Sequence, residues 1–248
     1  MMPEDVAQHE LLELLATGEM TPLGTLPWGS NYTFLTQITK DEPTHQEVLA
    51  VYKPRRGEAP LWDFPTGTLC LREYAAWLVS EALGWHLVPP TVLRDGDYGF
   101  GSVQLFIEND PAQHYFTFRD DPSACDQLRR IALFDLITNN ADRKSGHCLR
   151  DPNGRIWAID HGICFNAEYK LRTVIWDFAG QPIPEDLLGD LARLRLQVEP
   201  HHTLGKALRN LLSAEEINAF AKRIEALLRL RVFPKPNRYE RNIPWPPI

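Results

Sequence analysis

The residue pattern changes from strand-like to helix-like near residue 108, and this change constrains the fold more than any other feature. Before it, a helical pattern over residues 5–17 is followed by segments rich in alternating, β-branched and aromatic residues. After it the patterns are mainly helical. We therefore expect an α+β chain with a β-rich N-terminal lobe at residues 1–107, a helical C-terminal lobe at 108–240 and a Pro-rich tail at 241–248.

The β-rich lobe is predicted to contain two antiparallel hairpins and a helix between them. Strands at 32–38 and 47–53 are separated by a polar loop that contains a proline. Strands at 92–94 and 101–107 are separated by a turn rich in Asp and Gly. Helical spacing over 69–83 lies between the two pairs, and Gly84 ends it.

The helical lobe carries three helix-start signals and one short hairpin. Ser123 is predicted to cap a helix that runs to about Thr138, Pro184 is expected in the first turn of another, and Ser213 with Glu216 forms a capping box. Residues 147–150 and 155–159 form the hairpin around an Asp-Pro-Asn-Gly turn. The tail is too rich in proline for a helix and is expected to lie extended across the surface.

Composition excludes several classes of protein. A formal net charge of -7 argues against a nucleic acid or an anionic membrane as the main partner, because both favour a positive surface. The four cysteines form no C-x-x-C pair and have no zinc-type spacing. The acidic start and the lack of an apolar run of about 20 residues predict a cytoplasmic protein without stable membrane insertion.

A polar cluster at residues 139–147 directly follows a helix whose residues are nearly all apolar from Ile131 to Ile137. A helix buried on this face holds the loop after it in a fixed place, which suits a loop that positions reacting groups. A β-rich half followed by a helical half is also a layout in which a nucleotide binds in the cleft between lobes. The layout alone does not prove this function.

Phosphoryl transfer requires a group that orients the acceptor hydroxyl, oxygen ligands for a metal ion, and a cation on the phosphates. Asp142 is the candidate for the first role, and Asp160, at the end of a predicted strand, for the second. Lys53 on the strand at 47–53 is the candidate cation. Glu73 on the following helix would pair with Lys53 and fix its side chain.

These residues resemble motifs of the phosphatidylinositol 3- and 4-kinase-like superfamily, and the type II phosphatidylinositol 4-kinases are most similar. The matching segments, in chain order, are Gly29-Ser30-Asn31-Tyr32, Val51-Tyr52-Lys53-Pro54, Glu73 through Val88-Pro89-Pro90-Thr91, Ile137-Thr138-Asn139-Asn140-Ala141-Asp142-Arg143 and Ala158-Ile159-Asp160-His161-Gly162. The resemblance runs from about Trp28 to Phe165, and small uncharacterised bacterial proteins of the phosphatidylinositol-kinase-like type are similar over more of the length.

The resemblance implies a two-lobed protein-kinase-like fold that binds ATP and Mg or Mn. In this reading Gly29 and Ser30 cover the phosphates, and Asn140 and Arg143 brace the loop that carries Asp142. We expect adenine to lie against the strand that contains Val103, Leu105 and Ile107.

His147 departs from the family pattern. The family has a metal-binding Asn five residues after the catalytic Asp, and here that position holds His147. Imidazole suits manganese, iron or zinc better than magnesium, which prefers oxygen ligands. Either Asp160 and His147 hold manganese or a single magnesium, or the protein binds the nucleotide without turning it over.

Simpler interpretations remain for several residues. Asp142-Arg143 is also typical of a surface ion pair, and Lys53 of a solvated strand end. Gly29-Ser30 is equally consistent with a plain turn. Arg72 and Glu81 compete with Glu73, and the basic loop at Lys170, Arg172 and Trp176 is more simply a solvated loop than a substrate site.

The main hypothesis is a kinase that transfers phosphate from ATP to a hydroxyl of an unknown acceptor, a protein or small molecule rather than a lipid. One alternative is an inactive nucleotide-binding module. A second is a metal-dependent hydrolase that uses His147, Asp160 and His161, because water on a borderline metal is a good nucleophile. A third is transfer of the nucleotide itself to a protein. Bacterial relatives of the superfamily include protein kinases of the HipA type.

Overall fold

The computed structural model describes residues 3–26, 31–41 and 45–248. Contacts between Cα atoms divide the chain into two compact units. The first contains residues 1–74 and 89–107, and the second contains residues 75–88 and 108–248. The second unit includes 75–88 because helix α2 (Leu69–Leu83) runs through the division after Tyr74.

The first unit is built on a five-stranded antiparallel sheet with the strand order β1-β2-β3-β5-β4. Its strands are β1 (Glu19–Thr25), β2 (Phe34–Lys40), β3 (Gln46–Pro54), β4 (Thr91–Gly96) and β5 (Gly99–Leu105). The predicted hairpins, β2 with β3 and β4 with β5, are confirmed as antiparallel pairs. Strand β1 was not predicted individually; it is an edge strand, where Pro22 is tolerated, and its register shifts between Pro22 and Gly24.

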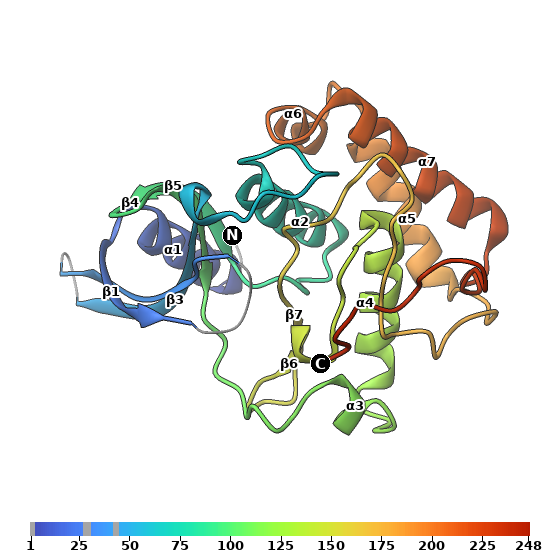
Figure 1. Cartoon of the computed structure of the whole chain (residues 1–248), viewed down its shortest axis with the longest axis horizontal. Helices are drawn as coiled ribbons and strands as arrows, with labels where there is room; N and C mark the ends of the chain where they lie inside the picture. The colour runs from blue at the N-terminus through green and yellow to red at the C-terminus, as the bar shows by residue number, and fades with distance from the viewer. Residues whose placement is uncertain (1–2, 27–30, 42–44) are drawn as a thin grey trace. The chain divides into compact units, whose positions relative to one another are not determined.

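The predicted helix near the start of the chain is confirmed as α1 (Pro3–Thr17), and it packs against β2, β4 and β5 (Figure 1). Alternate residues of the strands face this helix, so their apolar side chains form a core with Leu14 and Leu15. The Arg94 guanidinium donates hydrogen bonds to the carbonyl oxygens of Leu15, in the last turn of the helix, and of Gly18, directly after it.

The second unit is mainly helical and contains α3 (Tyr115–Phe118), α4 (Cys125–Thr138), α5 (Glu185–Gln197), α6 (Thr203–Arg209) and α7 (Ala214–Leu230). Helix α4 is its centre, because Ile131, Leu133, Phe134 and Ile137 are fully buried and the helix packs against α7 (Figure 1). The predicted hairpin is confirmed as β6 (Cys148–Arg150) and β7 (Ile156–Ala158), and β7 also packs on α4.

Two of the three predicted helix starts need correction. The Ser213 capping box is confirmed, since Ser213 Oγ accepts from the Glu216 amide and Glu216 Oε2 accepts from the Ser213 amide. The Ser123 cap is wrong: residue 124 is the N-cap of α4, and the Ser123 amide and hydroxyl instead donate to Asp121 Oδ1. Pro184 precedes the first turn of α5 by one residue, with extended backbone (φ -54, ψ 146).

Candidate active site

The loop that carries Asp142 begins where α4 ends. Asn139 closes the helix in the left-handed region (φ 55), and its side chain donates to the carbonyl oxygens of Asn166 and Glu168. The next amide, of Asn140, donates to the backbone oxygen of Asp135 at 3.0 Å. Asn140 Oδ1 in turn accepts from the Asp142 amide at 2.9 Å, so the backbone of Asp142 is held by the end of a buried helix.

A buried ion pair between Asp135 and Arg143 braces this loop from below. Both side chains are completely buried. Arg143 Nε lies 3.1 Å from both carboxylate oxygens of Asp135, and its terminal nitrogen lies 3.0 Å from Oδ1. Asn140 Nδ2 and Thr173 Oγ1 also donate to this carboxylate, at 3.0 and 3.2 Å. Burial alone would lower the pKa of Arg143, but the charge of Asp135 raises it above its ordinary value.

The remaining Arg143 donors join the Asp142 loop to the hairpin and to the segment after it. One terminal nitrogen donates to the backbone oxygens of His147 and Ile159, at 3.2 and 2.7 Å. The other lies 2.7 Å from His161 Nε2. Because a guanidinium has no acceptor atom, His161 Nε2 is the acceptor and carries no proton. One side chain therefore fixes the relative positions of the loop, residue 147 and residue 161.

Asp135 is the member of this network that the sequence analysis missed. Its signal was present: a carboxylate stands between Phe134 and Leu136 within the apolar part of α4. Charged residues are almost never buried unless they are paired, so an Asp on an apolar helix face indicates a buried cation elsewhere in the chain. The identity of that cation, Arg143, depends on tertiary structure.

The Asp142 side chain, next in sequence to the buried Arg143, is partly exposed, with a relative accessibility of 29%. Burial raises its pKa above the ordinary value of 3.8, and the nearby charge of Asp160 acts in the same direction. Lys144 Nζ, 3.4 Å from Asp142 Oδ2, opposes both effects by favouring the ionised form. Lys144 is thus the main cation that favours the ionised form of Asp142, and Arg143 adds a smaller effect in the same direction.

This arrangement predicts a pH dependence. If ionised Asp142 is required, activity rises with pH as Asp142 loses its proton, so the acidic limb lies above pH 3.8. Replacing Lys144 by Met removes the cation, raises the pKa of Asp142 further, and should move that limb to higher pH. The pH profile of turnover measures the shift. The same change at Lys222, which is exposed on α7, should leave the limb in place.

The structure brings Asp160 and His147 together. His147 Nε2 lies 3.3 Å from Asp160 Oδ2, and the amide of Ile159, the residue before Asp160, donates to the His147 backbone oxygen at 3.0 Å. Two adjacent ligands at right angles, each about 2.1 Å from one ion, are separated by about 3 Å, so this pair fits a shared cation. Asp160 adopts a left-handed backbone (φ 61), which is uncommon outside glycine and is found at functional sites.

Lys53 and Glu73 form an ion pair within the first unit. Lys53 Nζ lies 2.5 Å from Glu73 Oε1, and the Glu73 side chain is 4% exposed. Strand β5 approaches the Lys53 backbone so closely that a Cβ on Gly101 would lie 2.4 Å from the Lys53 oxygen, which leaves room only for glycine. The competing residues have other partners: the Arg72 guanidinium lies over the Phe64 ring, and Glu81 pairs with His86.

Five further residues were predicted to contact the nucleotide, and the structure describes three of them. Gly29 and Ser30 lie outside the described residues. Val103 is completely buried in the core beneath α1, Leu105 packs partly against the same core, and Ile107 is buried. Contact between adenine and these three residues stays a prediction.

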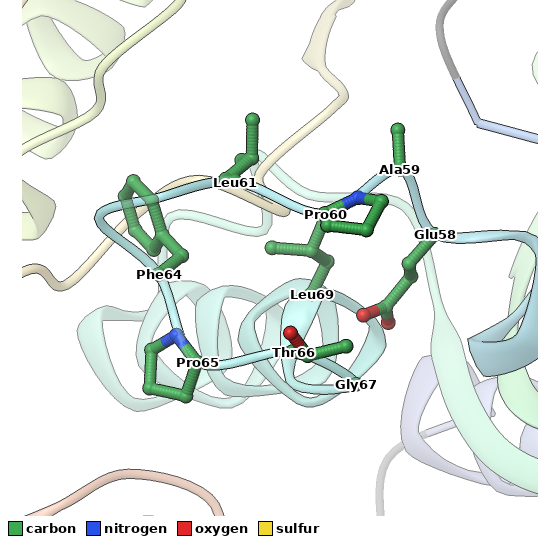
Figure 2. Close-up of a pocket in the computed structure, with 9 residues that line it drawn as sticks. All are labelled: Glu58, Ala59, Pro60, Leu61, Phe64, Pro65, Thr66, Gly67 and Leu69. Carbon is green, nitrogen blue, oxygen red and sulfur yellow. The ribbon is translucent and has the colours of Figure 1, made fainter.

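The loop between β3 and α2 surrounds a small hollow (Figure 2). Its lining runs from Glu58 to Leu69, and it is open to solvent with almost no room even for a water molecule. Pockets for small molecules have volumes of about 300–1,000 Å³, so this hollow is too small for a nucleotide.

The basic loop after the hairpin is tied to other parts of the second unit. Lys170 Nζ lies 3.2 Å from Glu168 Oε2, and the Arg172 carbonyl accepts from the Arg143 amide at 2.9 Å. Trp176 Nε1 donates to the backbone oxygen of Asn242. The loop therefore lines the back of the Asp142 loop.

Solved structures of kinases share this fold. The Golgi casein kinase with Mn/ADP bound matches 91% of this chain and 75% of its own with a TM-score of 0.60 at 16% identity. The Helicobacter pylori proinflammatory kinase CtkA matches 88% of this chain and 94% of its own, with a TM-score of 0.53 at 13% identity. The chain thus has a kinase-like α+β fold, with an antiparallel sheet in its N-terminal part and helices in its C-terminal part.

Sequence comparison identifies the family. The chain is 40% identical to protein Rv2133c of Mycobacterium tuberculosis over 94% of both proteins, and it belongs to the same family. Phosphatidylinositol 4-kinase gamma 4 of Oryza sativa subsp. japonica is 28% identical over 54% of this chain, which spans 28% of that enzyme. No model of a known protein family matches the chain. Among the residues that the structure describes, no helix has the length and apolar character needed to cross a membrane.

Proposed function

We propose that this protein is an ATP-dependent phosphotransferase of the phosphatidylinositol 3-/4-kinase-like type, acting on a hydroxyl of a protein or small molecule. The observation that carries the proposal is that one buried arginine connects two groups of candidate residues. Arg143 pairs with Asp135 directly after Asp142, and it also donates to the backbone oxygens of His147 and Ile159. His147 and the residue after Ile159, Asp160, form the candidate metal pair. The distant similarity to plant phosphatidylinositol 4-kinases supports the superfamily.

The roles follow from the chemistry of each group. Ionised Asp142 accepts the proton of the acceptor hydroxyl, and Asn140 and Arg143 hold its loop. Lys53, fixed by Glu73, binds phosphate oxygens. Asp160 and His147 would hold Mg or Mn, which supplies positive charge to the phosphate oxygens when bound.

The test is an ADP-release assay with ATP that compares magnesium with manganese in the wild type and in His147→Asn. A kinase releases ADP in a metal-dependent manner, and we expect the wild type to favour manganese and His147→Asn to shift the preference towards magnesium, because an amide oxygen is a harder ligand than imidazole. His201→Asn, an exposed histidine change after α5, serves as the control. The absence of ADP release with either metal would contradict the proposal.

An inactive nucleotide-binding module is the second candidate, and His147 at the metal pair favours it. It predicts that ATP with metal stabilises the protein by about 2.7 kcal/mol at a hundredfold excess of ATP over its Kd, without ADP release.

A metal-dependent hydrolase is less well supported, because Nε2 of His161 already accepts a hydrogen bond from Arg143. In the described parts of the chain, no three His, Cys, Asp or Glu side chains gather around a possible metal position. Nucleotide transfer to a protein would be recognised from the intact mass of the product.

Replacing Glu73 by Gln tests the Lys53 assignment. The change removes the charge that holds Lys53 and should lower kcat/KM for ATP by about tenfold, the equivalent of one charge-assisted hydrogen bond of about 1.4 kcal/mol. Glu81→Gln, on the same helix and paired with His86 instead, is the matched control and should change kcat/KM by less than about twofold. Equal effects of both substitutions would remove Glu73 from the site.

A further inference from the structure

The carboxyl-terminal segment at residues 237–248, here termed the strap, lies against the Asp142 loop. In Figure 1 it runs from the region beyond α7 past α4 towards the hairpin of β6 and β7. The Pro247 backbone oxygen accepts from the Ser145 amide at 2.9 Å. The Asn242 backbone oxygen accepts from the Thr173 amide at 3.0 Å and from Trp176 Nε1 at 3.2 Å. The strap therefore contacts two segments of the site.

One contact point, Thr173, pairs with Arg143, and the other, Ser145, begins the turn whose last residue, His147, accepts from Arg143 through its backbone oxygen. Thr173 pairs with Arg143 as a parallel bridge, and Thr173 Oγ1 also donates to Asp135. Ser145 is buried and begins the short helical turn η2 (Ser145–His147), which joins Asp142 and Lys144 to His147. The amide of Ser145 lies at the start of that turn. Holding it fixes where the turn begins and thereby fixes His147 relative to Asp142.

The strap is held by its backbone rather than by its large side chains. Pro244 is buried, whereas Tyr239 is 89% exposed and Trp245 is 78% exposed. A segment that buries little apolar surface opens more easily than a core element. We therefore expect the strap to open more easily than helix α4, which is buried.

We propose that the strap is a positioning element of the active site, which sets the spacing between Asp142 and His147 by holding the Ser145–His147 turn. The proposal rests on the proposed phosphotransferase function for its effect on turnover. Its effect on the Ser145–His147 turn is independent of that function. The Asp135–Arg143 ion pair is completely buried and does not involve the strap directly, so we expect detachment of the strap to keep this pair and to free the amides of Ser145 and Thr173.

The experiment compares the full chain with a variant that ends at Pro236, with and without a synthetic peptide of residues 237–248. Hydrogen exchange of the Ser145 and Thr173 amides reports the turn, and titration with Mn²⁺ alone reports the metal pair. Amides of α4 such as that of Phe134 are the internal control for folding. Trp245→Ala in the full chain is the control for loss of an exposed side chain.

We expect truncation to speed exchange at Ser145 and Thr173 by at least about tenfold while α4 stays protected. We also expect Mn²⁺ binding to weaken several-fold, kcat to fall with KM for ATP nearly unchanged, and the peptide to restore all of these. Trp245→Ala should behave as wild type. Exchange at Ser145 and Mn²⁺ affinity that match the full chain would overturn the proposal. If the wild type shows no turnover, the phosphotransferase function fails, and hydrogen exchange at Ser145 and Thr173 still decides the role of the strap.

Discussion

Replacing Asp142 by Asn is expected to reduce ATP-dependent transfer by a factor of about 10²–10⁴, the usual contribution of a general base. The amide has the same shape as the carboxylate but accepts no proton from the acceptor hydroxyl. The loop should keep its conformation, because the Asp142 backbone amide is held by Asn140 Oδ1 and the brace involves Arg143 rather than the Asp142 side chain. Rates of ADP release and acceptor labelling measure the effect, and KM for ATP should change little.

The control is Asp186→Asn, which makes the same change in charge at an exposed position of α5. It should leave turnover within about twofold of the wild type. Turnover of Asp142→Asn equal to that of this control would exclude Asp142 from the reaction. Loss of turnover together with loss of α4 amide protection would instead show that the substitution acts through folding.

Replacing Asp135 by Asn should be the most destabilising single change in this region. It leaves the Arg143 cation buried without its countercharge, for which removal of one partner costs about 3–5 kcal/mol. The new amide also presents N–H groups to the Arg143 and Asn140 donors that now bond the carboxylate. Chemical denaturation of the full chain, with the helical signal of the second unit as the readout, measures this loss.

A matched control lies on the same helix. Asp126 also pairs with an arginine, Arg129, but its side chain is 78% exposed. Asp126→Asn should therefore cost no more than about 0.5 kcal/mol, because water screens exposed ion pairs. Equal losses for the two variants would mean that the buried pair contributes no more to stability than a surface pair does.

The parts of the fold set by local patterns could be predicted from the sequence. Alternation of apolar and polar residues identified the strands of both hairpins, and the apolar run from Ile131 to Ile137 identified α4. Strand β1 was not predicted individually because its sequence, with Pro22 and Gly24, has weak strand propensity and its pairing is set by β2. The Ser123 cap failed because Asp121 offered its carboxylate to the same amide and hydroxyl.

In the candidate site, too, residues within local motifs could be predicted from the sequence, whereas contacts between distant residues could not. Asp142, Asp160 and Lys53 were predicted from motifs, and their roles stay predictions. The structure pairs Lys53 with Glu73, 20 residues further along the sequence. The buried contacts among Asp135, Asn140, Arg143, His161 and Thr173 join residues up to 38 positions apart, the separation of Thr173 from Asp135. Such contacts leave no local period in the sequence. The contact between Pro247 and Ser145 was beyond sequence reasoning for the same reason.

The left-handed backbone of Asp160 has a consequence for engineering. An L-residue in this conformation costs about 1–2 kcal/mol, and glycine avoids the cost. Glycine at this position would also remove a negative charge that lies close to Asp142. A library selected for heat resistance alone would therefore be drawn towards Asp160→Gly, and its most stable members would lack the carboxylate proposed to hold the metal. Thermostability screens of this family should score nucleotide turnover in parallel.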